Sequence, residues 1–197
     1  MNIFYLEKNP MRCAEMHNDK HCIKMILEYS QLLSTAHRFL DGIEVLEKRA
    51  VHGSFPVRWR NVKKWKLSDE RDKILYAATH INHPSAIWVR QSISNYMWLS
   101  HLLEELSSEY TYRYGKVHKC ERDGLVKLFL NRTPDNIPLG EFTEPTPAMP
   151  DEVKVIGDSI ASYRNYYIKN KQHLASWSGK VNSRPIPKWY EVNNATV

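Results

Sequence analysis

Apolar residues between positions 11 and 40 recur at the spacing of one helical face, and the segment contains no Gly or Pro. The predicted buried stripe consists of Ile23, Ile26, Leu27, Leu33 and Leu40. Asp41-Gly42 follows, and Gly is the usual residue just beyond a helix end. The pattern therefore predicts a first long helix from about residue 11 to residue 40.

A second helical pattern begins at Pro84, where a missing amide proton costs nothing because the first turn has no acceptor for it. It extends to about Tyr112, with Gly115 just beyond its end. Its apolar stripe consists of Trp88, Tyr96, Leu99, Leu102, Leu103, Leu106 and Tyr110. Shorter helices are expected at about 68–79, 120–130 and 151–171.

Two segments lack a clear period. Residues 43–68 contain Gly53, Pro56 and several basic residues without convincing strand alternation, so we expect an exposed basic loop. The stretch from Thr133 to Pro150 contains five prolines and is expected to be an extended connection. The predicted fold class is all-α: one compact domain over residues 1–197, built on two long helices plus shorter ones, with insertions at about 43–68 and 131–150.

Composition narrows the class of protein. With 42% hydrophobic residues in 197, the chain can bury one domain core, and 28 Lys and Arg against 22 Asp and Glu favour a polyanionic partner. Three cysteines fit neither a paired disulfide framework nor a four-thiolate zinc site. No apolar run approaches the ~20 residues of a bilayer span. We therefore expect a cytoplasmic protein with no membrane partner.

The first predicted helix carries acid, base and cation together. On a helix, one polar face would be formed by His17, His21, Lys24, Glu28 and Gln31. The plainer interpretation is a solvated face with Lys24 and Glu28 paired at i,i+4, which stabilises a helix by ~0.3–0.5 kcal/mol. Both interpretations stay open on the sequence alone.

The same face also carries two residues that could bind a metal ion. His17 and His21 are four residues apart, a spacing that can place two imidazoles on one ion, with Asp19 or Glu28 nearby. The arrangement lacks the Glu of a His-Glu-x-x-His motif, and the neighbouring lysines would oppose cation binding. The sequence therefore favours a site without metal or cofactor.

Two further features suggest contact with a phosphate-rich partner. The turn before Pro84 contains Asn82 and His83 at a helix start, where backbone amides attract anions or where these side chains cap the helix. Aromatic and basic residues alternate in 58–66, 110–119 and 163–171, a mixture that suits phosphate contact and base stacking. The segment 58–66 is the least core-like of the three.

The motifs around these residues resemble a known family. Asp19-Lys20-His21 followed by Glu28, the step Asn82-His83-Pro84 before an aromatic and Leu-rich helix, and Pro187-Lys188-Trp189-Tyr190 near the carboxyl end are its marks. They resemble the phage pyrimidine-dimer DNA glycosylases of the endonuclease V type and their uncharacterised phage and bacterial relatives. The resemblance implies an all-helical protein that bends DNA, flips a nucleotide and cuts an N-glycosidic bond without metal.

The resemblance also implies roles for individual residues. Glu28 would stabilise the positive sugar or an imine, and His21 and Lys24 would tune its charge. Asn2 stands where the family carries a terminal Thr whose amine is the nucleophile. Because Asn2 is larger than the residues after which Met is usually removed, Met1 would keep the terminal amine. A lysine (Lys8, Lys20 or Lys24) or water could then attack instead.

The resulting hypothesis is a DNA glycosylase, with abasic lyase activity as an option, that acts on duplex DNA in preference to single strands. A phage-encoded protein would act in the host cytoplasm. The expected nucleic-acid contacts are Lys20, Arg58, Trp59, Arg60, Lys63, Asn82, His83, Arg90, Arg164, Lys188, Trp189 and Tyr190. The alternatives are a non-catalytic nucleic-acid-binding protein, an enzyme of free nucleotides or modified bases, and a metal-dependent hydrolase. The lesion and the oligomeric state stay open.

Overall fold

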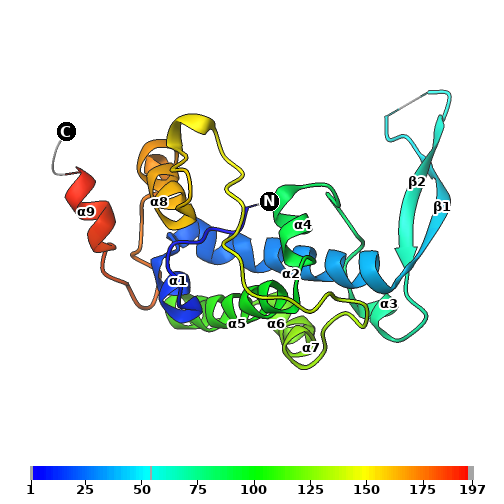
Figure 1. Ribbon diagram of the computed structural model, residues 1–197, viewed down its shortest axis with the longest axis horizontal. Coiled ribbons are helices and arrows are strands. Elements are labelled where there is room, and N and C mark those ends of the chain that lie inside the picture. Colours follow the sequence, from blue (N-terminus) through cyan, green and yellow to red (C-terminus); the bar gives the residue numbers. More distant parts are fainter. Residues whose placement is uncertain (1, 54, 195–197) are drawn as a thin grey trace.

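Two long helices, α2 (Asp19–Asp41) and α5 (Ile93–Tyr114), pack against each other at the centre of the computed structural model (Figure 1). The structure describes residues 2–53 and 55–194. The other helices of this part are α1 (Pro10–Met16), α3 (Arg71–Ile74), α4 (Pro84–Val89), α6 (Lys119–Arg122), α7 (Leu125–Asn131), α8 (Ser159–Asn170) and α9 (Lys188–Asn194), with 3₁₀ turns η1 (Asp151–Val153) and η2 (Gln172–Leu174). None of the described helices is long and apolar enough to cross a membrane.

The first predicted helix is two helices. The helix α1 ends at Met16, and His17 has extended backbone angles. Asn18 then caps α2, since its side-chain oxygen accepts a hydrogen bond from the His21 amide at 2.9 Å. The prediction of one continuous helix was wrong because an Asn side chain can satisfy a free backbone amide and so start a new helix.

The second predicted helix is also divided. Pro84 occupies the first turn of α4 as expected, but Ser92 starts α5 anew by accepting the Asn95 amide at 3.1 Å. Gly115 ends α5 with a φ of 64°, a left-handed conformation that favours glycine. The long connection from 132 to 150 contains no helix or strand, as predicted, and Thr143 fixes it to α5 through Asn95.

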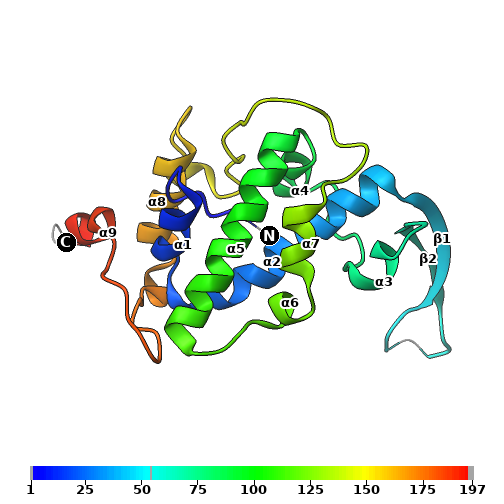
Figure 2. The same ribbon diagram turned by 90° about the horizontal axis from the view of Figure 1, so that it is seen from below.

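The all-α fold class was wrong. Residues expected to form a basic loop form an antiparallel hairpin of β1 (Ile43–Ala50) and β2 (Trp59–Lys66), in which Ile43 pairs with Lys66 and Ala50 with Trp59. The domain is thus mainly helical with one small sheet. The hairpin stands away from the helices at the end of α2 (Figures 1 and 2). Both of its faces meet solvent, so no burial selects alternating apolar positions, and the usual strand pattern is missing.

The core lies between α2, α5 and the amino-terminal segment, whose residues 3–6 are all buried. Ile26 and Leu33 of the predicted stripe are fully buried, whereas Ile23 and Leu27 are 41% and 40% exposed. The stripe on α2 was therefore predicted only in part. The helix turns Ile23 and Leu27 toward solvent on the side that also carries Lys24.

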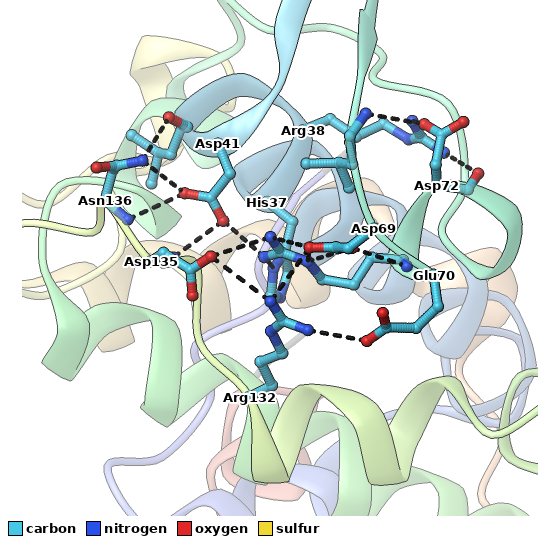
Figure 3. Close-up of polar contacts among 12 residues, drawn as sticks. His37, Arg38, Asp41, Asp69, Glu70, Asp72, Arg132, Asp135 and Asn136 are labelled. Atoms are coloured by element: carbon cyan, nitrogen blue, oxygen red, sulfur yellow. Dashed lines mark hydrogen bonds and ion pairs between the residues drawn. The ribbon is translucent and has the colours of Figure 1, made fainter.

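The base of the hairpin is anchored by a buried arginine. Arg38 of α2 uses every N–H of its guanidinium: it donates to the carbonyls of Tyr76, Trp65, Leu75 and Asp72 at 2.7–2.9 Å and to the Asp72 carboxylate at 2.6 Å (Figure 3). Since Trp65 belongs to β2, this network fixes the hairpin to the end of α2.

A neighbouring arginine cluster joins α2 to α3 and to the segment after α7. Arg71, whose side chain is 3% exposed, pairs with Asp41 at 2.6 Å, Asp69 at 2.8 Å and Asp135 at 3.1 Å. Arg132 adds bonds to Asp69 and Glu70 (Figure 3). A buried guanidinium with this many partners is a structural group, so we assign the cluster to the fold.

Candidate functional site

Glu28 lies in the middle of α2 with its side chain 15% exposed. The ammonium of Lys24 is 3.0 Å from its carboxylate, so the ion pair expected from the i,i+4 spacing is present. Lys24 itself is largely exposed, and Leu27 lies in the next turn toward solvent. The carboxylate is therefore near the surface but mostly shielded from water.

The turn before α4 lies against α2 one to two helical turns beyond Glu28. The Thr79 amide donates to Thr35 Oγ1 at 3.2 Å, which joins the turn to α2. His80 has a φ of 49°, a left-handed conformation uncommon for a residue with a side chain, and its Nδ1 is 2.7 Å from Thr79 Oγ1. Arg90 supports the turn from behind by donating to the Ile81 carbonyl at 2.6 Å.

His83 caps α4, and its pKa is affected by the charge of Glu28. Its Nδ1 accepts a hydrogen bond from the Ser85 amide at 3.2 Å, as the capping interpretation of this turn predicted. Burial lowers the pKa of His83, the nearby His80 lowers it further, and the negative charge of Glu28 opposes both effects. A half-buried carboxylate and a half-buried imidazole from two different elements thus share one electrostatic environment.

The amino-terminal segment reaches α2 in the same region. The Phe4 amide donates to Tyr29 Oη at 3.2 Å, one residue beyond Glu28. The side-chain oxygen of Asn2 is buried and has no hydrogen-bond partner within residues 2–53 and 55–194. A buried amide oxygen without a donor is costly in a folded protein. The amine of Met1 lies outside the described residues.

His21 does not reach Glu28. It is buried, stacks on the Phe4 ring with centroids 4.1 Å apart, and its Nδ1 is 2.6 Å from Tyr167 Oη. Burial lowers the pKa of His21 to about 2, so the ring stays neutral. Seven residues of helix separate it from Glu28 by about 10 Å along the axis. We therefore assign His21 to packing between α2 and α8, and of the two residues predicted to act on Glu28 only Lys24 pairs with it in the described part of the chain.

His17 and His21 do not form a metal pair. His17 follows the end of α1, so the two residues do not share one helix face. The ring of His17 is bonded to the Cys13 carbonyl at 2.8 Å and to Tyr29 Oη at 2.9 Å. In the part of the chain that the structure describes, no group of three His, Cys, Asp or Glu residues is placed to hold a metal ion.

Asp19, the acid of the motif that suggested the family, joins three parts of the fold. Its carboxylate accepts hydrogen bonds from Ser176 Oγ at 2.6 Å, the Ser178 amide at 3.0 Å and Arg113 at 3.2 Å. Arg113 is fully buried and also bonds Glu109 at 2.6 Å. The sequence analysis did not identify Arg113, although an Arg within an apolar helical stripe is itself a signal of a buried ion pair.

The candidate nucleic-acid contacts fall into separate groups. Arg58, Trp59, Arg60 and Lys63 lie on the hairpin, and Trp59 is 65% exposed. Asn82 and His83 lie beside Glu28's helix in the turn before α4, where Arg90 has a supporting role. Lys20 is exposed in the first turn of α2. The hairpin and α9 stand at opposite ends of the molecule, so one small site cannot include them all (Figures 1 and 2).

The carboxyl-terminal group is mostly packing. The guanidinium of Arg164 lies 5.4 Å from the Trp189 ring and donates to the Leu6 carbonyl at 3.0 Å. Tyr190 is 5% exposed and packs on Trp177. A cavity of about 430 Å³ is lined by Arg164 and Trp189, and another of about 660 Å³ is lined by Lys188, but neither includes Glu28. Tyr190 is therefore a packing residue, whereas Trp189, predicted with it to contact nucleic acid, is partly exposed beside the first of these cavities.

Comparisons with protein-family models, curated proteins and solved structures found no match to this chain. The resemblance to the glycosylase family thus stays a prediction that depends on the motifs. What the geometry adds is the neighbourhood of Glu28: a shielded carboxylate, a cation at Lys24, and the imidazole of His83 from the adjoining turn. Such a set can stabilise positive charge and transfer protons without a metal.

Proposed function

We propose that this protein is a DNA glycosylase that cleaves the N-glycosidic bond of a damaged or modified base, with Glu28 as the catalytic carboxylate. The observation that carries the proposal is the position of Glu28: a shielded carboxylate on α2 close enough to the turn before α4 to influence His83. Lys24 holds the carboxylate in place through the ion pair at 3.0 Å.

The chemistry requires a fixed negative charge. When the C1′–N bond breaks, its electron pair leaves with the base, the base takes up a proton from solvent, and positive charge develops on the sugar. A carboxylate with little access to water stabilises that charge more strongly than one in bulk solvent. Water then adds to C1′ and releases a proton, which Glu28 or His83 accepts. His83 suits this step because its lowered pKa keeps it neutral near pH 7.

The test measures base release by the purified protein from ultraviolet-irradiated and undamaged duplexes, and lyase activity on abasic duplexes. In Glu28→Gln the carboxylate charge is lost while the side-chain shape is kept, so release should fall by at least ~100-fold, the scale expected for one acid or base group. Affinity for the duplex should stay within twofold. Glu105→Gln is the matched control, since Glu105 is also half-buried on a long helix but lies on α5.

The outcomes separate the candidate functions. Borohydride trapping on abasic DNA would indicate an imine and thus lyase activity through an amine. Base release that is equal in wild type and Glu28→Gln would contradict the assigned role. Salt-sensitive binding to duplexes without any release would favour a non-catalytic nucleic-acid-binding protein. Loss of activity in chelator would favour a metal-dependent hydrolase instead.

A further inference from the structure

The positive charge of the protein is concentrated on the hairpin of β1 and β2. Residues 43–66 contain seven Lys and Arg against two Glu, a formal charge of +5, while the whole chain carries +6. The remaining residues are thus close to neutral. The excess charge that suggested a polyanionic partner therefore belongs to one projecting element, at the opposite end of the molecule from α9 (Figure 1).

Within the hairpin the charge is unevenly distributed. Near the base, Glu44 pairs with Lys63 at 2.9 Å, and Glu47 pairs with Lys66 at 3.1 Å and also with Lys64. Residues 48–61 contain four basic residues, Lys48, Arg49, Arg58 and Arg60, and no acid. The outer half of the hairpin is therefore a cationic ribbon, and we use that name for residues 48–61.

The register places like charges against each other. Arg49 and Arg60 are direct cross-strand partners, a pairing that destabilises an antiparallel sheet. The opposite face of the same half carries Trp59, 65% exposed, across from Ala50. Charges that protect open strand edges can have either sign, so edge protection does not explain opposed arginines or an exposed Trp. Phosphates between the arginines would offset their repulsion, and a nucleic acid also offers base surfaces to an exposed Trp.

From these observations we infer that the cationic ribbon is a docking arm that binds in a groove of duplex nucleic acid. The major groove of B-DNA admits a two-stranded β-ribbon, and the whole hairpin, with eight paired residues in each strand, spans about 26 Å at ~3.3 Å per residue. Arg49 and Arg60 neutralise backbone phosphates, and Trp59 supplies an apolar contact. The arm is held in place because Arg38 binds the Trp65 carbonyl at 2.9 Å. This inference does not depend on glycosidic chemistry at Glu28.

The test is the salt dependence of binding to an undamaged ~20-base-pair duplex, measured by fluorescence anisotropy. Each phosphate contact adds about 0.9 to the slope of log K against log salt, so Arg49→Gln/Arg60→Gln should lower the slope by about 2 and weaken binding roughly 60-fold at 0.1 M salt. Its urea midpoint should not fall, because the substitution removes a repulsion. Trp59→Ala should weaken binding about tenfold with an unchanged slope.

The matched control removes the same charge from the helical body. Arg122 and Lys127 are both exposed on or beside α7, so Arg122→Gln/Lys127→Gln should change the slope by less than 0.5 in the same assay, well below one full contact. Equal slopes for the two double variants would overturn the inference. So would ribbon-dependent binding to vesicles with 30% phosphatidylserine alongside unaltered duplex binding, since the arm would then serve a membrane. Ribbon-dependent duplex binding without base release would leave it standing and reject only the proposed function.

Discussion

Replacing Arg113 by Met tests whether the buried ion cluster around α5 stabilises the protein. The guanidinium donates to Glu109 at 2.6 Å, to the carbonyls of His17 and Glu15 at 2.9 Å each, and to Asp19 at 3.2 Å. The variant leaves two carbonyls without the Arg113 donor, and among the described residues Glu109 then keeps Arg184 as its one cation. Removing one partner of a buried charge network costs about 3–5 kcal/mol of the 5–15 kcal/mol typical of a domain.

Urea unfolding followed by tryptophan fluorescence measures this loss. With a urea slope of about 2 kcal/mol per molar, the expected cost moves the midpoint down by about 1.5–2.5 M. Arg12→Met is the matched control, because Arg12 pairs with Glu15 at 2.8 Å but its side chain is 62% exposed. Exposed pairs contribute ~0–1 kcal/mol, so its midpoint should move by less than about 0.5 M. A shift of that small size in Arg113→Met would refute the reasoning.

Two further predictions concern pH. Burial raises the pKa of Asp19, but its hydrogen bonds to Ser176, Gly179 and Arg113 outweigh this, so the pKa in the folded protein is lowered. The carboxylate therefore stabilises the fold above pH ~4, and this contribution is lost as the pH falls further. In urea unfolding, Asp19→Asn should be less stable than wild type at pH 7 by ~1–3 kcal/mol, and its free energy of unfolding should fall less on acidification to pH 3. Burial and the Arg71 charge lower the pKa of His37 to about 4. The unfolded state therefore binds a proton at a higher pH than the folded state does, and stability falls as the pH drops from ~6.5 to 4. In His37→Gln the slope of stability against pH over this range should decrease by the equivalent of about one proton, as measured by the urea midpoint, and an unchanged slope would exclude His37 as its source.

Helical segments with a strong period were predictable from the sequence, and their interruptions were not. The apolar stripe of α5 located that helix correctly because its leucines meet α2 on one side. Asn18 and Ser92 break the helices by capping, and capping depends on a single side-chain oxygen and leaves no trace in the apolar period. The hairpin was missed for a related reason. Trp65 is buried at its base, but the rest of the hairpin buries too few side chains to show an alternating pattern.

The ion pair at the candidate site could be predicted from the sequence, but which other residues lie beside it could not. The spacing of Lys24 and Glu28 gave their ion pair, because four residues complete about one helical turn. The same rule grouped His17 and His21 with them, although one lies beyond a helix break and the other is held by Tyr167, far away in the sequence. Contacts of that separation depend on the tertiary fold, which local spacing does not specify.

The passage from α2 into β1 through Gly42 turns one helix into a spacer. Glu28 lies on α2, and β1 of the hairpin follows the end of the same helix. From Glu28 to Asp41, α2 is about 20 Å long at ~1.5 Å per residue. That length equals about six base pairs of duplex at ~3.4 Å each. A duplex bound by the proposed arm would therefore meet Glu28 at a fixed offset, because the helix between them is largely buried and held in place by its packing.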